Sequence, residues 1–244
     1  MSINQKLVKL RFEKNMDKYS ENALVQKEIA SKLVNALCNI QTNFEDIMEL
    51  GAGSAVLTEE LVSKIKFKNY CANDLTSKSE NYVKKIIQDC RFYEGNALKI
   101  KPDRKFDLII SNAMFQWINL EQASDKFKTL IKPQGILAFS TFTEGNFAQI
   151  KEITGLSLDY KTGDEITKIF SRDWELLYRE EYSNIMTFNN PLELLLHLKY
   201  TGVNSLSDNM FTIKDIKGFC DKFNQLYNKT ELTYLPLILI FKKR

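Results

Sequence analysis

The 244-residue sequence predicts an α/β fold built around a mostly parallel sheet, and two observations support this prediction. Short apolar segments alternate with longer amphipathic stretches through residues 46–154, as β-strands connected by α-helices do. A glycine-rich turn, Gly51-Ala52-Gly53, follows the first of these segments, and such turns are typical of ligand-binding α/β sheets. The connections between parallel strands are expected to be right-handed crossovers.

The first two thirds of the chain carry most of this pattern. Residues 1–42 mix polar and apolar positions at helical spacing, as at Leu33 and Leu37, and are predicted to be helical. Strands are predicted next at 46–50, 69–75, 91–93, 106–112 and 135–142. Helices are predicted between and after them at about 54–65, 78–88, 118–131 and 146–154.

The last third of the chain breaks the alternation. In order, a strand, a helix, a polar stretch, a second helix and a β-type segment are predicted at about 178–188, 192–202, 203–209, 212–227 and 230–243. We expect the two late strands to close one edge of the sheet, with a helical insertion between them at about 190–228. Within that insertion, His197 lies on an apolar-rich helix and is predicted to be a packed core histidine.

The composition argues against several classes of protein. Lysine and arginine exceed aspartate and glutamate by only 34 to 31, which does not indicate a nucleic-acid partner. The single histidine disfavours Ser-His-Asp hydrolases and histidine-based metal sites, and the four cysteines form no CxxC motif. The N-terminus lacks an apolar signal-peptide core, and apolar runs such as 235–241 are too short to span a membrane. We therefore expect a cytoplasmic protein with reduced thiols and no metal, nucleic-acid or membrane association.

The glycine-rich turn is the most informative local motif. The preceding strand ends in an acid, Glu49, and Gly51 and Gly53 allow a sharp turn and the close approach of a ligand. A dinucleotide site would place a third glycine where this chain has Val56, and Glu49 would repel a phosphate group. The alternative interpretation is a tight turn without a ligand.

Polar residues also follow the next three predicted strands. Asp74 ends the second strand, where an acid accepts hydrogen bonds from both ribose hydroxyls of a nucleoside, and its alternative role is to cap the next helix. Asn96 follows the third strand, where its amide is suited to an adenine edge, and Asn112 follows the fourth. Because ligands bind at this edge of open α/β sheets, these residues are expected to line one site.

Together these features resemble the class I S-adenosylmethionine-dependent methyltransferases. The sequence ELGAG at 49–53 is similar to the first motif of that family, and Asp74 is similar to its ribose acid. FDLIISN at 106–112 resembles the fourth-strand motif, and LIKPQGILAF at 130–139 resembles the approach to the fifth strand. The chain departs from the family pattern at three positions, where a small glycine, an adenine acid and a second glycine are replaced by Ala55, Asn96 and Gln134.

The resemblance implies a Rossmann-like sheet, mostly parallel with an antiparallel last strand, in a single domain over residues 1–244. It implies a helical lid at 1–42, a cofactor-binding core at 43–155, and a sheet edge with the helical insertion at 156–244. The implied cofactor is S-adenosylmethionine, with S-adenosylhomocysteine as product and no metal. The residues implied in cofactor binding are Glu49, Gly51, Ala52, Gly53, Asp74, Leu75, Asn96, Ala97 and Asn112.

A narrower resemblance spans almost the whole chain. It is to the carboxyl O-methyltransferases that methylate malonyl-acyl carrier protein for biotin synthesis. The matching residues are Phe12, Tyr19, Gln26, Ser111-Asn112, Gln116-Trp117, Leu198-Lys199, Gly202 and Leu232-Thr233-Tyr234. This implies that the acceptor is the free carboxylate of malonyl-acyl carrier protein, or of malonyl coenzyme A. Other small-molecule methyltransferases, acting on a quinone precursor or an aconitate-like acid, and a non-catalytic S-adenosylmethionine-binding protein are the alternatives.

The narrower resemblance also implies roles for individual residues. Tyr19, Gln116 and Trp117 would form the catalytic acceptor side, and Tyr19 would contact either the substrate or the cofactor carboxylate. The subfamily often has an arginine where this chain has Lys126 and Lys128, so a lysine would have to contact the substrate carboxylate there, or the contact is made elsewhere. An acidic carrier protein would be steered by a basic rim, for which the candidates are Lys78, Lys84 and Lys85, or Lys126 and Lys128.

Overall fold

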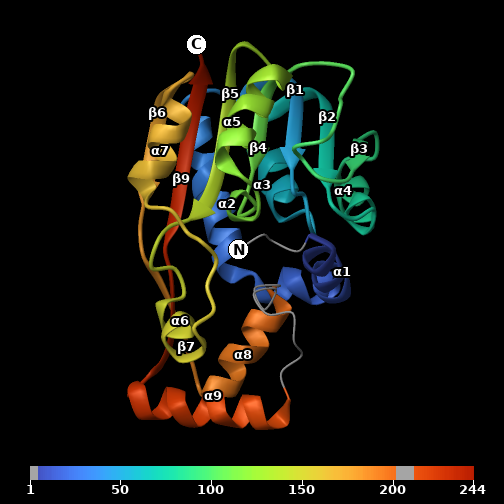
Figure 1. Cartoon of the computed structure of the whole chain (residues 1–244). Coiled ribbons are helices and arrows are strands. Elements are labelled where there is room, and N and C mark those ends of the chain that lie inside the picture. The colour runs from blue at the N-terminus through green and yellow to red at the C-terminus, as the bar shows by residue number, and fades with distance from the viewer. Residues whose placement is uncertain (1–4, 202–211) are drawn as a thin grey trace.

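The computed structural model describes residues 5–201 and 212–244, in which a central sheet has helices on both faces (Figure 1). Its strands are β1 (Asn43–Leu50), β2 (Lys66–Asp74), β3 (Arg91–Glu94), β4 (Phe106–Ser111), β5 (Ile131–Phe142), β6 (Trp174–Glu181) and β9 (Pro236–Lys243). They lie in the order β3-β2-β1-β4-β5-β9-β6. Strands β1 to β5 pair in parallel, whereas β9 is antiparallel to both β5 and β6. The predicted fold class is therefore confirmed.

Helices cover the sheet because both of its faces are apolar. On one face α2 (Leu24–Cys38), α3 (Val56–Lys64) and α4 (Lys78–Ile86) pack against the sheet. On the other face α5 (Leu120–Leu130) and α7 (Gly163–Ser171) enclose a cluster of phenylalanine rings, in which Phe115 stacks on Phe139 with centroids 4.0 Å apart. Burial on both sides explains why β4 and β9 are nearly continuous apolar runs.

The late strands differ from the prediction in how they are divided. The segment predicted as one strand at 178–188 forms the end of β6 and a separate strand, β7 (Asn184–Phe188). The C-terminal β-type segment likewise forms β8 (Thr230–Tyr234) and β9, which begins at Pro236. Strands β7 and β8 pair with each other in a second, two-stranded sheet. Each predicted strand was too long because the chain passes from one sheet to the other within it.

Helix α7 was not predicted, although its N-terminus carries a recognisable signal. Thr162 accepts a hydrogen bond from the Glu165 backbone N–H at 3.2 Å, and the Glu165 carboxylate accepts one from the Thr162 N–H at 2.8 Å. This reciprocal pair is a capping box. The spacing of a threonine and a glutamate three residues later could have located the start of the helix.

The remaining helices gather at the C-terminal ends of the parallel strands, below the sheet in Figure 1. They are α1 (Gln5–Asn22), α6 (Ala148–Thr154), α8 (Pro191–Tyr200) and α9 (Ile213–Leu226), and a short 3-10 turn, η1 (Phe115–Trp117), follows β4. The predicted polar stretch at 203–209 and Gly202 lie outside the described residues. In the parts of the chain that are described, no helix has the length and apolar character needed to cross a membrane.

Candidate functional site

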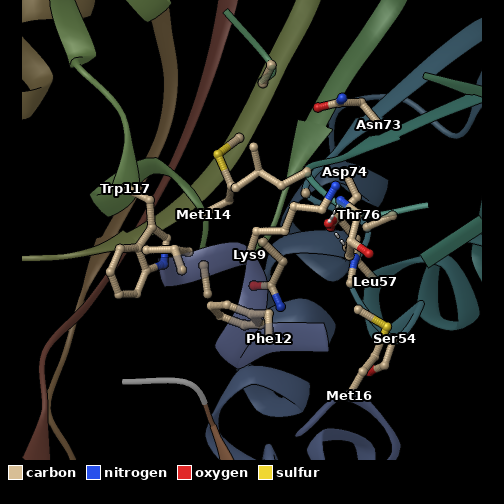
Figure 2. Close-up of a pocket in the computed structure, with 18 of the residues that line it drawn as sticks. Lys9, Phe12, Met16, Ser54, Leu57, Asn73, Asp74, Thr76, Met114 and Trp117 are labelled. Carbon is tan, nitrogen blue, oxygen red and sulfur yellow. Dashed lines mark hydrogen bonds between the residues drawn. The ribbon is translucent and has the colours of Figure 1, made fainter. Parts of the chain in front are cut away.

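A pocket lies where β1, β2 and β4 end, and residues of α1 line one side of it (Figure 2). It contains most of the residues predicted to bind a cofactor, namely Gly51, Ala52, Gly53, Asp74, Leu75, Asn96, Ala97 and Asn112. Tyr19 and Trp117, predicted at the acceptor side, line it too. In Figure 2, Asp74 and Trp117 lie on opposite sides of the pocket, with Lys9, Phe12 and Met114 between them.

The glycine turn has the backbone conformation for which glycine is suited. Gly51 and Gly53 have φ values of +69° and +53°, in the left-handed region. A Cβ atom on Gly51 would lie 2.7 Å from the Met114 Cγ, so the turn can approach the η1 segment only with glycine at this position. Ala55, which replaces a family glycine, also has a positive φ of 65°.

Asp74 connects the turn to the end of β2. One carboxylate oxygen accepts a hydrogen bond from the Gly53 N–H at 2.8 Å, and the other accepts one from the Thr76 N–H at 3.1 Å. Burial raises the pKa of Asp74, and these backbone donors act against that shift. Ser77 is the N-cap of α4, so the helix-capping role considered for Asp74 is wrong. The Leu75 N–H and the Ser79 hydroxyl also bond to this carboxylate, so Asp74 is held rigidly at the pocket wall.

Glu49 lies behind the turn and is not among the described residues that line the pocket. It is 1% exposed, and one oxygen accepts hydrogen bonds from the Thr58 hydroxyl at 2.6 Å and from the Tyr70 hydroxyl. The other oxygen has no partner in the described structure. Burial, more than any nearby charge, raises the pKa of Glu49 to about 7. Through these hydrogen bonds Glu49 joins the end of β1 to α3 and β2 behind the glycine turn.

Asparagine side chains fix the ends of three strands. Asn112 donates to the Gln26 backbone carbonyl at 2.9 Å and accepts from the Ser140 hydroxyl at 2.7 Å, which ties α2 to β4 and β5. Asn73 donates to two carbonyls at the end of β3, at 2.7 and 2.9 Å. The Asn96 amide oxygen accepts from the Leu98 N–H at 2.8 Å, which holds the turn after β3.

Two buried polar atoms on the pocket wall have no hydrogen-bond partner in the described structure, the Ser54 Oγ and the Gln26 Oε1. These side chains are 6% and 4% exposed. Because an unpaired buried polar group costs free energy, a polar ligand in the pocket would be stabilised by bonding to these two atoms. Together with the Asp74 carboxylate and the glycine turn, they fit S-adenosylmethionine, which carries a ribose and a zwitterionic methionyl group.

Two of the three residues predicted at the acceptor side, Tyr19 and Trp117, line the pocket. Trp117 packs edge-on against Phe12, with ring centroids 6.3 Å apart, and no described residue bonds to its indole N–H. The Tyr19 hydroxyl likewise has no hydrogen-bond partner among the described residues, and burial raises its pKa. Gln116 is not among the lining residues, because its amide donates to the Ala113 carbonyl at 2.6 Å and holds the η1 turn.

The lysines considered for the substrate carboxylate lie elsewhere. The Lys128 Nζ is 2.5 Å from an Asp173 oxygen, and neither Lys126 nor Lys128 is among the described lining residues. Lys9 from α1 does line the pocket, and its ammonium group lies 2.7 Å from Glu94. Of the two alternatives for the substrate carboxylate, this arrangement favours a contact made elsewhere over one from Lys126 or Lys128.

Three carboxylates could together hold a metal ion: Glu45, Asp46 and Asp107. They lie near the N-terminal ends of β1 and β4, whereas the pocket lies at the C-terminal ends. The Lys132 ammonium group is 2.8 Å from Asp46 and 3.0 Å from Asp107. The cluster is therefore already paired with a cation, far from the pocket.

Several lining residues were not predicted. Val8, Phe12 and Met16 recur along the face of α1 that also carries the predicted Tyr19, and this helical spacing could have identified the wall that they form. Met114 lines the pocket because Ala113, with a φ of 51°, turns the chain after β4, and no pattern in the sequence marks that turn. His197, predicted to be a core residue, is 6% exposed and lies 2.6 Å from the Tyr234 hydroxyl.

Comparison with known structures shows the fold. NodS of Bradyrhizobium japonicum, an N-methyltransferase crystallised with S-adenosyl-L-homocysteine, has a TM-score of 0.55 at 12% identity, covering 88% of this chain and 86% of its own. YjhP of E. coli has a TM-score of 0.58 at 13% identity, covering 87% of this chain and 92% of its own. The chain thus has the fold of these proteins.

Comparison of sequences shows the family. A family model described as a methyltransferase domain matches residues 48–139. The malonyl-acyl-carrier-protein O-methyltransferase of Calditerrivibrio nitroreducens is 34% identical, over 96% of both chains. That of Haemophilus influenzae is 32% identical, over 98% of this chain and 95% of its own. Since these relatives match along almost their entire length, the chain belongs to the malonyl-acyl-carrier-protein O-methyltransferase family, whose members are S-adenosylmethionine-dependent enzymes.

Proposed function

We propose that this protein transfers the methyl group of S-adenosylmethionine to the free carboxylate of malonyl-acyl carrier protein. The observation that carries the proposal is a pocket with two different ends. One end offers the Asp74 carboxylate, which suits a ribose, and Trp117 lies across the pocket from it, where the indole N–H suits a carboxylate. Tyr19 lines the pocket between α1 and the sheet, close enough to Asp74 for that carboxylate to add to the rise that burial causes in its pKa. The names of relatives that match over nearly the full length support the choice of acceptor.

The residues proposed to hold the cofactor follow from the chemistry of each position. Asp74 accepts from the ribose hydroxyls, and the loop at Asn96 and Ala97 borders the adenine. The glycine turn, with Ser54, and Gln26 surround the methionyl group, where their unpaired polar atoms find partners. Bound in this way, S-adenosylmethionine supplies an electrophilic methyl group on a positively charged sulfur.

Tyr19 and Trp117 then orient the acceptor carboxylate. A carboxylate is already ionised at about pH 7, so it needs no general base, and no histidine is among the described residues that line the pocket. Attack of an anion on a cation reduces both charges in the transition state, which favours a pocket from which water is excluded. Alignment of the reacting atoms supplies about 7–11 kcal/mol in favourable systems.

Helix α1 is placed to exclude that water. Its Glu13 accepts a hydrogen bond from the Thr76 hydroxyl at 2.5 Å, and its Asp17 lies 2.9 Å from the Lys78 ammonium group. These contacts hold Phe12 and Tyr19 over the ends of β1 and β2. We therefore assign α1 the role of a lid.

The decisive experiment compares malonyl-acyl carrier protein with malonamyl-acyl carrier protein, in which an amide replaces the carboxylate. With S-adenosylmethionine present, mass spectrometry should detect the methyl ester and S-adenosylhomocysteine from the malonyl form only, because the amide is a poor nucleophile. Equal methylation of both forms would exclude the carboxylate mechanism. Tight binding of S-adenosylmethionine without any methyl transfer would favour a non-catalytic protein.

A further inference from the structure

The pocket carries very little positive charge for a site proposed to bind an anion. Among its described lining residues, Lys9 and Asp74 are the charged ones. The Lys9 ammonium group lies 2.7 Å from a Glu94 oxygen, and Glu94 is the register partner of Asp74 on the neighbouring strand. The one lysine is therefore paired at the ribose end, beside two carboxylates.

Two uncharged hydrogen-bond donors line the pocket: Trp117, across from Asp74, and Tyr19, whose pKa is raised by burial and further by the Asp74 carboxylate. The Trp117 indole N–H and the Tyr19 hydroxyl have no partner in the described structure. In Figure 2 the Trp117 nitrogen lies on the side of the indole that faces Phe12, across the pocket from Asp74. Phe12 and Met114 add apolar surface. Such a site can orient a carboxylate, but a buried carboxylate without a counter-charge is strongly unfavourable.

We propose, on the basis of the function proposed above, that Tyr19 and Trp117 bind the acceptor carboxylate only when the cofactor beside them is cationic, because the described residues that line the pocket provide no cation except Lys9, which is paired with Glu94. The acceptor therefore binds after S-adenosylmethionine and does not bind stably to the S-adenosylhomocysteine complex. The order of binding is set by the charge of the pocket.

The lack of positive charge beside Tyr19 and Trp117 also promotes release of the products. In the reaction, an acceptor oxygen forms a bond to the methyl carbon and the carbon–sulfur bond breaks, with its electron pair left on sulfur. The carboxylate becomes a neutral ester and the sulfonium becomes a neutral thioether. Tyr19 and Trp117 then face an uncharged ester, and the electrostatic attraction that held the acceptor is lost. A fixed arginine or lysine at this position would instead keep binding any carboxylate.

Binding measurements without turnover test this proposal. The full chain is saturated with sinefungin, which has a cationic amine in place of the methylsulfonium, or with neutral S-adenosylhomocysteine, and is titrated calorimetrically with malonyl-acyl carrier protein. The sinefungin complex should bind at least about tenfold more tightly. Malonamyl-acyl carrier protein, which makes the same carrier contacts without the charge, should bind both complexes equally. Equal affinity of malonyl-acyl carrier protein for the two complexes would overturn the proposal.

A variant with an added charge gives a second, independent test. Ile118 follows Trp117 and lines the pocket, so Ile118→Lys places an ammonium group beside the donors, and Ile118→Met adds similar length without charge. In Ile118→Lys, the S-adenosylhomocysteine complex should bind malonyl-acyl carrier protein nearly as well as the sinefungin complex, whereas Ile118→Met should keep the difference. If a folded Ile118→Lys protein still binds malonyl-acyl carrier protein more tightly with sinefungin than with S-adenosylhomocysteine, the proposal that cofactor charge controls acceptor binding is contradicted.

Measurements of ester formation and of acceptor binding distinguish the charge coupling from the proposed function. Formation of the methyl ester without any difference between sinefungin and S-adenosylhomocysteine rejects the charge coupling alone. Absence of the ester, with no binding of malonyl-acyl carrier protein to either complex, rejects the proposed function and the inference together.

Discussion

At the scale of single residues, we expect cofactor binding to depend most on the Asp74 side chain. Replacement by alanine would remove the proposed acceptor for ribose hydroxyls and leave the Gly53 and Thr76 N–H groups unpaired. We expect Asp74→Ala to weaken S-adenosylmethionine binding at least about 100-fold, since hydrogen bonds to charged groups are the stronger ones. Calorimetry measures this. Glu94→Ala, at the register partner on β3, should change the affinity far less, and equal losses in both variants would contradict the assignment.

Glu49 makes a different contribution, to stability against pH. Its pKa is raised from 4.5 to about 7 in the folded protein, so the unfolded chain loses this proton first as the pH rises. The free energy of unfolding therefore falls between pH 4.5 and pH 7 and is level above that range. Glu49→Gln removes the ionisation but keeps an acceptor for Thr58 and Tyr70.

Denaturation with urea at several pH values checks this prediction. Relative to the parent protein, Glu49→Gln should gain up to about 3 kcal/mol of stability as the pH rises through that window. Glu94→Gln should show the opposite sign and at lower pH, because the Lys9 ammonium group lowers the pKa of Glu94, so the parent gains stability relative to this variant as the pH rises toward 4.5. A stability difference between Glu49→Gln and the parent that does not vary with pH would show that Glu49 ionises normally.

At the scale of elements, Ala55 and Gln134 are two of the residues that carry a side chain where the backbone favours glycine. Their φ values are 65° and 62°; Ala55 lies after the C-terminal end of β1, and Gln134 lies near the N-terminal end of β5. We expect Ala55→Gly and Gln134→Gly each to raise the free energy of unfolding by about 1 kcal/mol, additively because the sites are distant. Chemical denaturation measures both effects. Gly135→Ala should instead destabilise, since its Cβ would lie 2.8 Å from Ile131 and 3.0 Å from the Lys132 carbonyl.

Elements also show where prediction from sequence was limited. The strands and helices from β1 to β5 were predicted in the right order, because each has its own periodicity. The divisions between β6 and β7 and between β8 and β9 were not predicted, because each pair is continuous β-type sequence. Only the pairing partners, β9 beside β5 and β7 beside β8, decide where one strand stops.

At the scale of the whole molecule, helix α1, the proposed lid, connects distant parts of the chain. Asp17 on α1 accepts a hydrogen bond from Tyr82 and pairs with Lys78, both on α4. We expect Asp17→Ala to speed hydrogen exchange of the α1 amides severalfold without affecting β4. Lys84→Ala, which breaks an ion pair within α4, serves as the control. Unchanged exchange in α1 would show that these contacts do not hold the lid.

The sequence by itself determined the fold class, the glycine turn and the strand ends that carry Asp74, Asn96 and Asn112, because these depend on local periodicity and on the shared C-terminal edge of parallel strands. Only the tertiary structure decided that Glu49 and Gln116 leave the pocket and that Lys9 and Met114 line it. The direction of a side chain depends on which neighbours it packs against, and here those neighbours are distant in sequence: Lys9 meets Glu94, and Met114 meets Gly51. The charge balance of the pocket is therefore a property of the folded chain.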